Sequence, residues 1–269
     1  MNQYSAIGGG EPIKPPILFI HGAFTRAERW RPWLTYFRDA GYDCIAPSLP
    51  AHDPPDPARL QRLTFDDYLA SISDVCDSLA TPPIVIGHSM GGLLAQHLAA
   101  ARPCKALILV SSTPPWRAKT AWRAVPYAFY YMLPVVTGRP IRAHPRAALN
   151  LVLHDLSPDE QRELTPMFAY ESGKAYRTMV FGGAPMSERD LGCPVLVVSG
   201  AEDRLMKPAV GARLAAFYGA EHFVIPGRGH SLVAESLIET VAAGVRQWIE
   251  QLPGGAPHAA PSLRADAVV

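Results

Sequence analysis

Three side chains of this sequence have the types that together make a serine nucleophile. Ser89 is the centre of the pentapeptide Gly-His-Ser-Met-Gly, Asp203 follows an apolar run at 195–198, and His230 follows a second apolar run at 223–225. A serine hydroxyl becomes a strong nucleophile only when a base removes its proton, and that base must itself be oriented by a third group. The three residues therefore predict a nucleophile, an orienting acid and a base, each placed just after a strand.

The residues around Ser89 have the composition of a sharp turn from a strand into a helix. An apolar run at 83–86 precedes the turn and a helix-like stretch at 92–101 follows it. Such a turn forces its middle residue toward positive φ, so the residues two positions away must be small, as Gly87 and Gly91 are. The first amides of the helix then lie beside the hydroxyl, where they suit a developing oxyanion. The alternative is a glycine-rich turn with an incidental serine.

The acid and the base each have an alternative interpretation. Glu202 lies beside Asp203 and is the second candidate for the acid, and both could belong to a solvated turn. Against the solvated turn, the loop after Val110 reads Ser-Ser-Thr-Pro-Pro and offers no carboxylate. A lone histidine in a loop is usually structural or exposed, but His230 follows the last expected strand, behind a strand-end acid. This position favours a catalytic base.

Four motifs in this order resemble the α/β-hydrolase superfamily. They are His21-Gly22-Ala23-Phe24, Gly87-His88-Ser89-Met90-Gly91-Gly92, Gly200-Ala201-Glu202-Asp203 and Gly229-His230-Ser231. The resemblance covers residues 16–112 and 190–252. It implies a nucleophile at Ser89, an acid at Asp203 and a base at His230. It also implies an oxyanion hole made by the backbone N–H of Met90 and that of Ala23 or Phe24, and no metal or cofactor is expected.

The chain departs from the superfamily pattern in two places. Many relatives have Asp-Leu-Pro-Gly-His-Gly where this chain has Ser-Leu-Pro-Ala-His-Asp at 48–53. That loop is usually structural, so the change casts little doubt on the chemistry. Too few residues precede Pro16 for the N-terminal hairpin of many relatives. We therefore expect six or seven strands rather than eight.

Buried strands alternate with amphipathic helices, which predicts an α/β fold with a mostly parallel sheet covered on both faces. Strands are expected at 16–20, 42–49, 83–86, 106–110, 194–199 and 222–225, and helices at 26–40, 64–79, 92–101, 210–218 and 232–252. Thr64 and Asp67 predict a capping box. The expected core is 1–113 with 190–252, and 114–189 is an inserted helical cap by resemblance. Residues 253–269 lack a hydrophobic pattern and are expected to be a disordered tail.

The cap is expected to supply the roof of the substrate pocket. Pocket residues are predicted to be His88, Trp116, Phe129, Tyr130 and Met132, although packing is the commoner use of such aromatic side chains. Residues 116–154 also carry six cations and no acid: Arg117, Lys119, Arg123, Arg139, Arg142 and Arg146. They form either a solvated cationic face or a surface for an anionic partner, such as a carboxylate substrate or a phosphate-bearing acyl carrier.

Composition limits the remaining classes. The chain has 269 residues and a formal net charge of +1, which gives no reason to expect a nucleic-acid partner. The four cysteines include no C-x-x-C pair, which argues against a metal or redox framework. Residues 1–10 do not have the form of a secretory leader, so a reducing, cytoplasmic setting is the expectation. The most apolar segment, 125–136, is too short to span a membrane.

The leading hypothesis is hydrolysis of a carboxylic ester or related acyl bond through an acyl-enzyme, on an apolar small-molecule substrate that is either neutral or anionic. Thioester cleavage, lactone opening and C–C bond hydrolysis use the same constellation, and the cations of the cap slightly favour the thioester of an acyl carrier or coenzyme A. Dehalogenase and epoxide-opening relatives generally carry an aspartate at the elbow, so Ser89 argues against both. A ligand-binding receptor or non-hydrolytic catalyst of the same fold is the alternative from another class.

Overall fold

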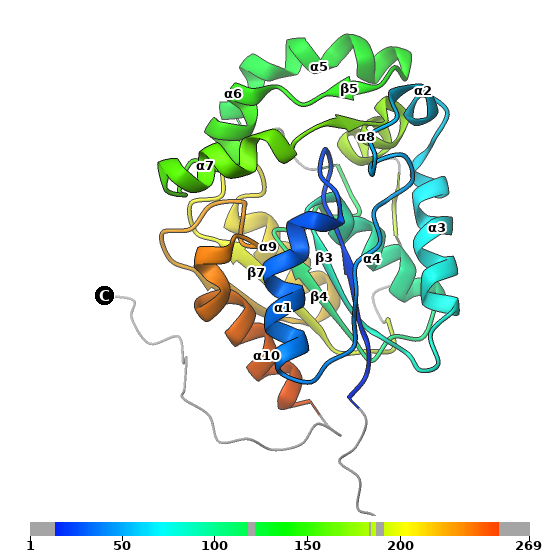
Figure 1. Cartoon of the computed structure of the whole chain (residues 1–269), viewed down its shortest axis with the longest axis vertical. Helices are drawn as coiled ribbons and strands as arrows, with labels where there is room; N and C mark the ends of the chain where they lie inside the picture. Colours follow the sequence, from blue (N-terminus) through cyan, green and yellow to red (C-terminus); the bar gives the residue numbers. More distant parts are fainter. Residues whose placement is uncertain (1–13, 118–121, 183, 187–190, 253–269) are drawn as a thin grey trace, which may run out of the picture.

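A six-stranded parallel sheet forms the centre of the computed structural model, which describes residues 14–117, 122–182, 184–186 and 191–252 (Figure 1). The strand order is β2-β1-β3-β4-β7-β8, and every neighbouring pair is parallel. The strands are β1 (Ile17–Ile20), β2 (Cys44–Ile45), β3 (Ile84–His88), β4 (Ala106–Val110), β7 (Val195–Gly200) and β8 (Glu221–Ile225). This confirms the predicted α/β fold, and the sheet has six of the expected six or seven strands.

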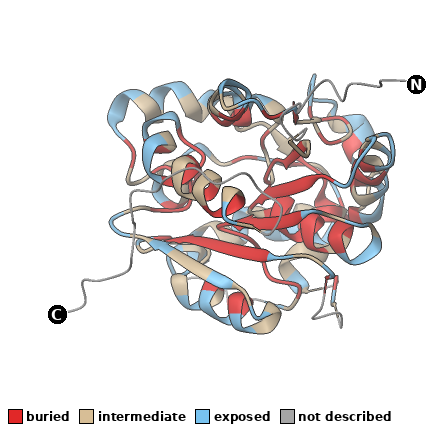
Figure 2. Ribbon diagram, turned by 90° about the horizontal axis from the view of Figure 1, so that it is seen from below, coloured by how far each residue is buried: buried red, intermediate tan, exposed pale blue. Residues whose placement is uncertain are grey.

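Helices cover both faces of the sheet because its strands are apolar on both sides. Along β1, Ile17 and Phe19 belong to one buried cluster, while Leu18 and Ile20 belong to the other. Successive side chains of a strand point to opposite faces, so each strand contributes to both clusters. The central strands are buried along their length, as Figure 2 shows.

The two clusters define which helices lie on each face. The first face packs against α1 (Arg31–Asp39) and α10 (Ala243–Glu250), and the second against α3 (Phe65–Asp77), α4 (Met90–Ala101) and α9 (Pro208–Tyr218). Helix α3 begins with the predicted capping box, in which Thr64 and Asp67 exchange hydrogen bonds. Short helical turns occur at η1 (Ala27–Trp30), α2 (Pro57–Leu60), η5 (Glu235–Leu237) and η6 (Ile238–Ala242).

The chain between β4 and β7 forms a separate layer over the carboxyl ends of the strands (Figure 1). Its elements are η2 (Trp122–Ala124), α5 (Val125–Thr137), β5 (Ile141–Arg142), α6 (Pro145–Ala147), η3 (Ala148–Val152), α7 (Pro158–Leu164), η4 (Thr165–Met167), β6 (Tyr170–Glu171) and α8 (Gly173–Phe181). Strands β5 and β6 pair in antiparallel fashion. We refer to this layer as the cap. The expected tail at 253–269 lies outside the described residues.

Two elements are shorter than predicted. The strand expected at 42–49 is only Cys44–Ile45, because β2 is an edge strand that pairs with β1 alone and Pro47 lacks the N–H that would extend the ladder. The helix expected at 232–252 starts at Glu235 as a short turn and becomes α-helical only from Ala243. Within the described ranges, no helix is long and apolar enough to cross a membrane.

Candidate active site

Ser89 lies at the turn between β3 and α4 with a backbone φ of 54°. Positive φ is the conformation expected at a nucleophile elbow and costs energy for a residue with a side chain. Flanking glycines make the turn sterically feasible, because a Cβ on Gly87 would lie 2.4 Å from the Gly91 carbonyl oxygen and one on Gly91 would lie 2.2 Å from that of Ile20. The amide of Ser89 also donates to the Val110 carbonyl, 3.1 Å away on β4.

Asp203 and His230 meet over the carboxyl edge of the sheet. The imidazole Nδ1 of His230 donates to Oδ2 of Asp203 at 2.8 Å, and both side chains are buried. The other carboxylate oxygen of Asp203 accepts from the amides of Leu205 and Met206, at 2.8 and 2.9 Å. Glu202, the alternative acid, is exposed. The structure therefore brings Asp203, rather than Glu202, to the histidine and fixes its orientation with backbone donors.

This arrangement leaves the Nε2 lone pair of His230 as the available base. The hydroxyl of Ser89 and the imidazole of His230 line the same cavity, although no hydrogen bond joins them among the described residues. Such contacts are often loose before substrate binds. His88 Nε2 donates to the His230 carbonyl at 2.9 Å, while burial, followed by the charge of His230, holds the pKa of His88 well below its usual range. His88 is therefore neutral and supports the loop that carries the base.

The two amides considered with Met90 for the oxyanion hole differ in their availability. The Phe24 amide donates to Oε2 of Glu171 at 3.1 Å, so it is not free for a substrate oxygen. The Ala23 amide has no hydrogen-bond partner in the described part of the chain, and Ala23 lines the cavity. The Met90 amide is the first of α4 and has no partner within the helix. Of the two alternatives, the geometry favours Ala23.

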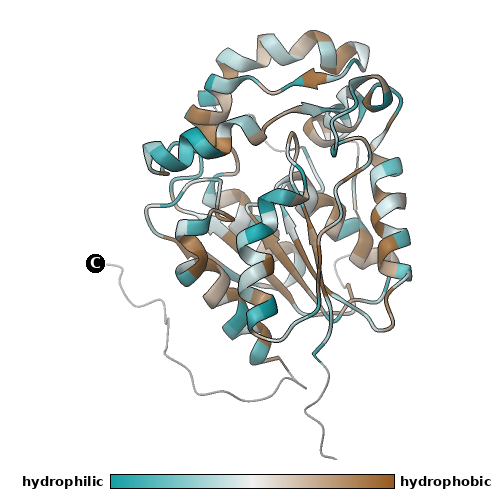
Figure 3. Cartoon of the chain, in the orientation of Figure 1, coloured by the Kyte–Doolittle hydropathy of each residue, from teal (hydrophilic) through white to brown (hydrophobic). Residues whose placement is uncertain are grey.

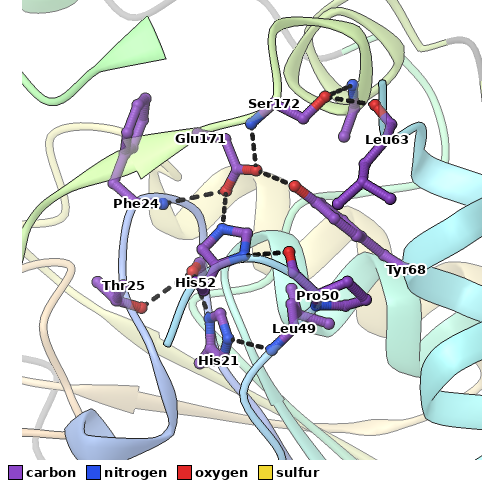
Figure 4. Close-up of polar contacts among 12 residues, drawn as sticks. His21, Phe24, Thr25, Leu49, Pro50, His52, Leu63, Tyr68, Glu171 and Ser172 are labelled. Carbon is purple, nitrogen blue, oxygen red and sulfur yellow. Dashed lines mark hydrogen bonds and ion pairs between the residues drawn. The ribbon is translucent and has the colours of Figure 1, made fainter. Parts of the chain in front are cut away.

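Glu171, which sequence reasoning did not single out, lies at the centre of a buried network that joins the cap to the core (Figure 4). Four donors surround its carboxylate: the amide of Phe24 and Nε2 of His52 at one oxygen, and the hydroxyl of Tyr68 and the amide of Ser172 at the other. The distances are 3.1, 3.2, 2.7 and 2.7 Å. Burying a carboxylate costs its hydration, and the four hydrogen bonds to Glu171 offset that cost.

Hydrogen-bond partners fix the charge of the two histidines in this network. His52 faces two acceptors, Glu171 and the Pro50 carbonyl, so both ring nitrogens must carry protons. Burial opposes this charge, but Glu171 outweighs burial, and the pKa of His52 is raised. The pKa of Glu171 is lowered because His52 and the hydrogen bonds overcome its burial. His21 accepts from the Leu49 amide, and burial followed by the charge of His52 lowers its pKa to about 3.

A cavity of about 380 Å³ lies between the cap and the elbow and is lined mostly by apolar side chains. Of the predicted pocket residues, His88 and Met132 line it, but Trp116, Phe129 and Tyr130 are not among its lining residues. Trp116 packs against Phe217 with ring centroids 5.4 Å apart. Phe129 and Tyr130 are exposed on the outside of α5. The structure thus does not place these three residues at the cavity. For Phe129 and Tyr130 the sequence could not show this, because α5 is apolar on all sides and its pattern does not indicate which side faces inward.

Arg29 also lines this cavity, and sequence reasoning did not find it. It is buried in η1 and donates to Oγ of Ser231, the residue after His230, at 2.6 Å. Burial lowers the pKa of its guanidinium to about 10, so it is a cation at neutral pH. This buried positive charge is one of the causes that keep the pKa of His88 low.

The geometry of the elbow, the Asp203–His230 pair and the parallel sheet agrees with the comparison to known families. A model of the "Alpha/beta hydrolase family" matches residues 17–243. The chain belongs to this family. This match confirms the resemblance to the α/β-hydrolase superfamily that the four sequence motifs indicate.

Relatives with assigned names include a pyrethroid hydrolase of Sphingobium wenxiniae, which is 30% identical over 49% of this chain and 44% of that protein. This chain spans about half or less of the length of the first curated relatives that it matches. Among solved structures, a pyrethroid hydrolase of Sphingobium faniae has a TM-score of 0.69 and 22% identity, covering 88% of this chain and 98% of that one. An Arabidopsis methylesterase has a TM-score of 0.68 and 14% identity, covering 87% and 99%.

Proposed function

We propose that this protein hydrolyses carboxylic esters with an apolar part through an acyl-enzyme on Ser89. The observation that carries the proposal is the 2.8 Å hydrogen bond from His230 Nδ1 to Asp203, which leaves Nε2 free in the cavity that Ser89 also lines. Relatives named a pyrethroid hydrolase and a methylesterase support the same class of reaction. The apolar lining supports a substrate with a hydrophobic acyl or alcohol group.

In the proposed reaction, Ser89 Oγ attacks the ester carbonyl carbon and its proton passes to His230 Nε2. The carbonyl oxygen becomes an oxyanion that the Met90 and Ala23 amides stabilise. The tetrahedral intermediate then expels the alcohol, which takes the proton from His230 and leaves an acyl group on Ser89. Water repeats the sequence, with His230 again as the base, and releases the carboxylic acid. Asp203 keeps Nδ1 protonated throughout.

A fluorophosphonate probe and a panel of p-nitrophenyl esters of increasing chain length test this proposal. We expect the probe to label wild-type protein and Ser71→Ala, a control on α3, but not Ser89→Ala. The kcat of Ser89→Ala should fall by several orders of magnitude, because little remains beyond binding and oxyanion stabilisation. Near-normal turnover by Ser89→Ala would refute the assignment, and labelling without turnover of any ester would favour the receptor hypothesis.

A coenzyme A thioester belongs in the same panel. Arg117 is exposed and also lines the cavity, so its guanidinium is available to the phosphate groups of such a substrate. A higher kcat/KM for the thioester than for the matched oxygen ester would favour a thioesterase on the same catalytic residues. A higher kcat/KM for the oxygen ester would support the carboxylic-ester reaction proposed above.

A further inference from the structure

Helix α5 presents a continuous row of large apolar side chains to the outside of the molecule. The row consists of Trp122 in the preceding turn η2 and of Val125, Phe129, Met132, Leu133 and Val136 in α5. Apart from the adjacent pair Met132 and Leu133, these residues are three or four positions apart, and we call the row the outer face of α5. Phe129 is 75% exposed and Leu133 is 64% exposed. In Figure 1, α5 is the outermost helix of the cap, on the side away from the sheet. Contiguous exposed patches of this kind mark interaction surfaces.

The inner side of the same helix is apolar as well. Tyr127, Ala128, Tyr131 and Val135 line the cavity, and α5 contains no charged residue between Val125 and Thr137. A surface helix normally has one polar side, and a helix that is hydrophobic all round is normally buried. Figure 3 shows the mixture of white and brown along α5, in contrast to the teal patches on α1 and α7. Helix α5 therefore has no charged side for water to solvate, and Tyr130 is an exposed polar side chain among its apolar neighbours.

The cavity that holds Ser89 opens within this apolar surface. Met132, Val136 and Phe181 all line the cavity, and they are 53%, 64% and 51% exposed. The same side chains thus form the rim of the opening and part of the outer surface. A protein docked over the outer face of α5 would close this opening. A lipid phase would instead place its apolar chains directly at it.

Exposed arginines flank α5 at both ends in the chain and continue through β5 and α6. Arg117, Arg123, Arg139, Arg142 and Arg146 are all exposed, and no acid occurs between residues 116 and 154. The Arg123 guanidinium lies 4.6 Å from the Trp122 ring, and that of Arg117 lies 5.8 Å from the Phe181 ring. In a two-fold dimer through this face, these cations would approach the same cations of the second copy. The charge favours an anionic occupant over a second copy of the chain.

We propose that the outer face of α5 docks the protein on an anionic lipid surface, with the cavity opening directed at the acyl chains. Apolar side chains on one side of a helix and arginines at its margins are the features that bind a helix in the plane of a lipid interface. The docking itself depends only on this surface. Its use in presenting lipid-borne esters to Ser89 rests on the proposed function.

Flotation of the full chain with vesicles tests the docking without any measurement of activity. We expect binding to vesicles of phosphatidylcholine mixed with phosphatidylglycerol, and much weaker binding to phosphatidylcholine alone. The double variant Phe129→Ser, Leu133→Ser should weaken binding by about a hundredfold, because two large side chains no longer enter the apolar phase. Arg139→Gln with Arg142→Gln should weaken binding to the anionic vesicles by about tenfold or more. Val224→Ser is the control, since Val224 is 43% exposed but lies on β8, outside the cap.

Activity on a short, water-soluble p-nitrophenyl ester separates this proposal from the proposed function. Neither Phe129 nor Leu133 is among the cavity-lining residues, so the double variant should hydrolyse that ester at the wild-type rate. Docking is overturned if the wild type does not float with the anionic vesicles, or if it binds both vesicle types equally. It is also overturned if sedimentation shows a wild-type dimer that the double variant abolishes, since a second copy then covers this face.

Discussion

The carboxylate of Glu171 accepts a hydrogen bond from the backbone N–H of Phe24, and this contact joins residues 147 positions apart in the chain. The Phe24 carbonyl in turn accepts from the Ala169 amide at 2.8 Å, so the cap holds both polar groups of this peptide backbone. Phe24 has a positive φ of 66°, which a residue with a side chain adopts only when its surroundings enforce it. These contacts hold the residue that follows Ala23, and we propose that they help to position the Ala23 amide that we assign to the oxyanion hole.

Replacing Glu171 by glutamine should lower kcat about tenfold to a hundredfold with little change in KM. The carboxylate accepts from four donors, and a glutamine side chain must turn its NH₂ toward two of them. Loss of one oxyanion donor costs about a hundredfold to a thousandfold in kcat, and a displaced donor costs less. Steady-state kinetics on a p-nitrophenyl ester give the split between kcat and KM.

Tyr68→Phe is the matched control for Glu171→Gln. It removes one donor from the network, but at the carboxylate oxygen that does not contact Phe24. We expect a loss of about 1 kcal/mol in the free energy of unfolding and a kcat close to wild type. If Glu171→Gln lowers stability and leaves kcat as unchanged as Tyr68→Phe does, then Glu171 has only a structural role.

The charged pair of His52 and Glu171 should make stability depend on pH in a defined direction. Unfolded, the two groups titrate near their ordinary pKa values of 6.5 and 4.5. Since the folded pKa of His52 is raised, its contribution is complete below about pH 6.5 and is lost as the pH rises through the raised value. Since the folded pKa of Glu171 is lowered, its contribution is complete above about pH 4.5 and is lost as the pH falls through the lowered value.

Urea unfolding of wild type and His52→Gln at several pH values measures this effect. The stability advantage of the wild type should be largest between the two ordinary pKa values and should shrink as the pH rises through the raised pKa of His52. His222→Gln is the control with the opposite sign, because burial lowers the pKa of His222, and protonation below its ordinary value of 6.5 penalises the folded wild type. A His52→Gln difference that is constant with pH would mean that His52 is neutral in the fold.

Asp203→Asn should lower kcat by roughly three to four orders of magnitude while the protein stays folded. An amide at this position no longer stabilises the imidazolium, and it can hold His230 in the wrong tautomer. Glu202→Gln is the matched control, since Glu202 is the neighbouring acid, is exposed and was the alternative on sequence grounds. Equal losses in the two variants, measured with the same ester, would contradict the assignment of the acid.

The local patterns of the sequence predict the buried central strands and the residues around the elbow, but not the short edge strand β2. The positive φ of Ser89 and the burial of β1 on both faces follow from short-range spacing, and the structure has both. The Glu171 network does not follow from spacing, because His52 and Glu171 are 119 residues apart and no local pattern pairs them. One available signal was that Glu171 is an isolated acid between Tyr170 and Ser172, at the end of an apolar stretch.

The cap illustrates a different physical limit of sequence reasoning. Helical periodicity reveals the inner side of a helix only when the other side is polar. In α5 both sides are apolar, so the sequence could not distinguish Tyr131, which lines the cavity, from Phe129, which faces outward. Because a surface helix normally exposes a polar side, the exposed apolar residues of α5 indicate an interaction surface.

Gly200→Ala should separate the acid from the base, because Gly200 is where β7 approaches the loop that carries His230. A Cβ on Gly200 would lie 2.1 Å from the Gly229 carbonyl oxygen and 2.3 Å from that of Arg228, and backbone atoms cannot rotate away as a flexible side chain can. The loop must therefore move, and with it the 2.8 Å contact between His230 and Asp203. A displacement of about 1 Å at a catalytic group can cost about a hundredfold in rate, so we expect a kcat loss of that order.

Gly244→Ala is the matched control, since nothing lies within 4 Å of its Cβ position in α10, and it should gain about 0.5–1 kcal/mol of stability at unchanged kcat. Wild-type kcat in Gly200→Ala would mean that the distance between these two loops does not limit the reaction.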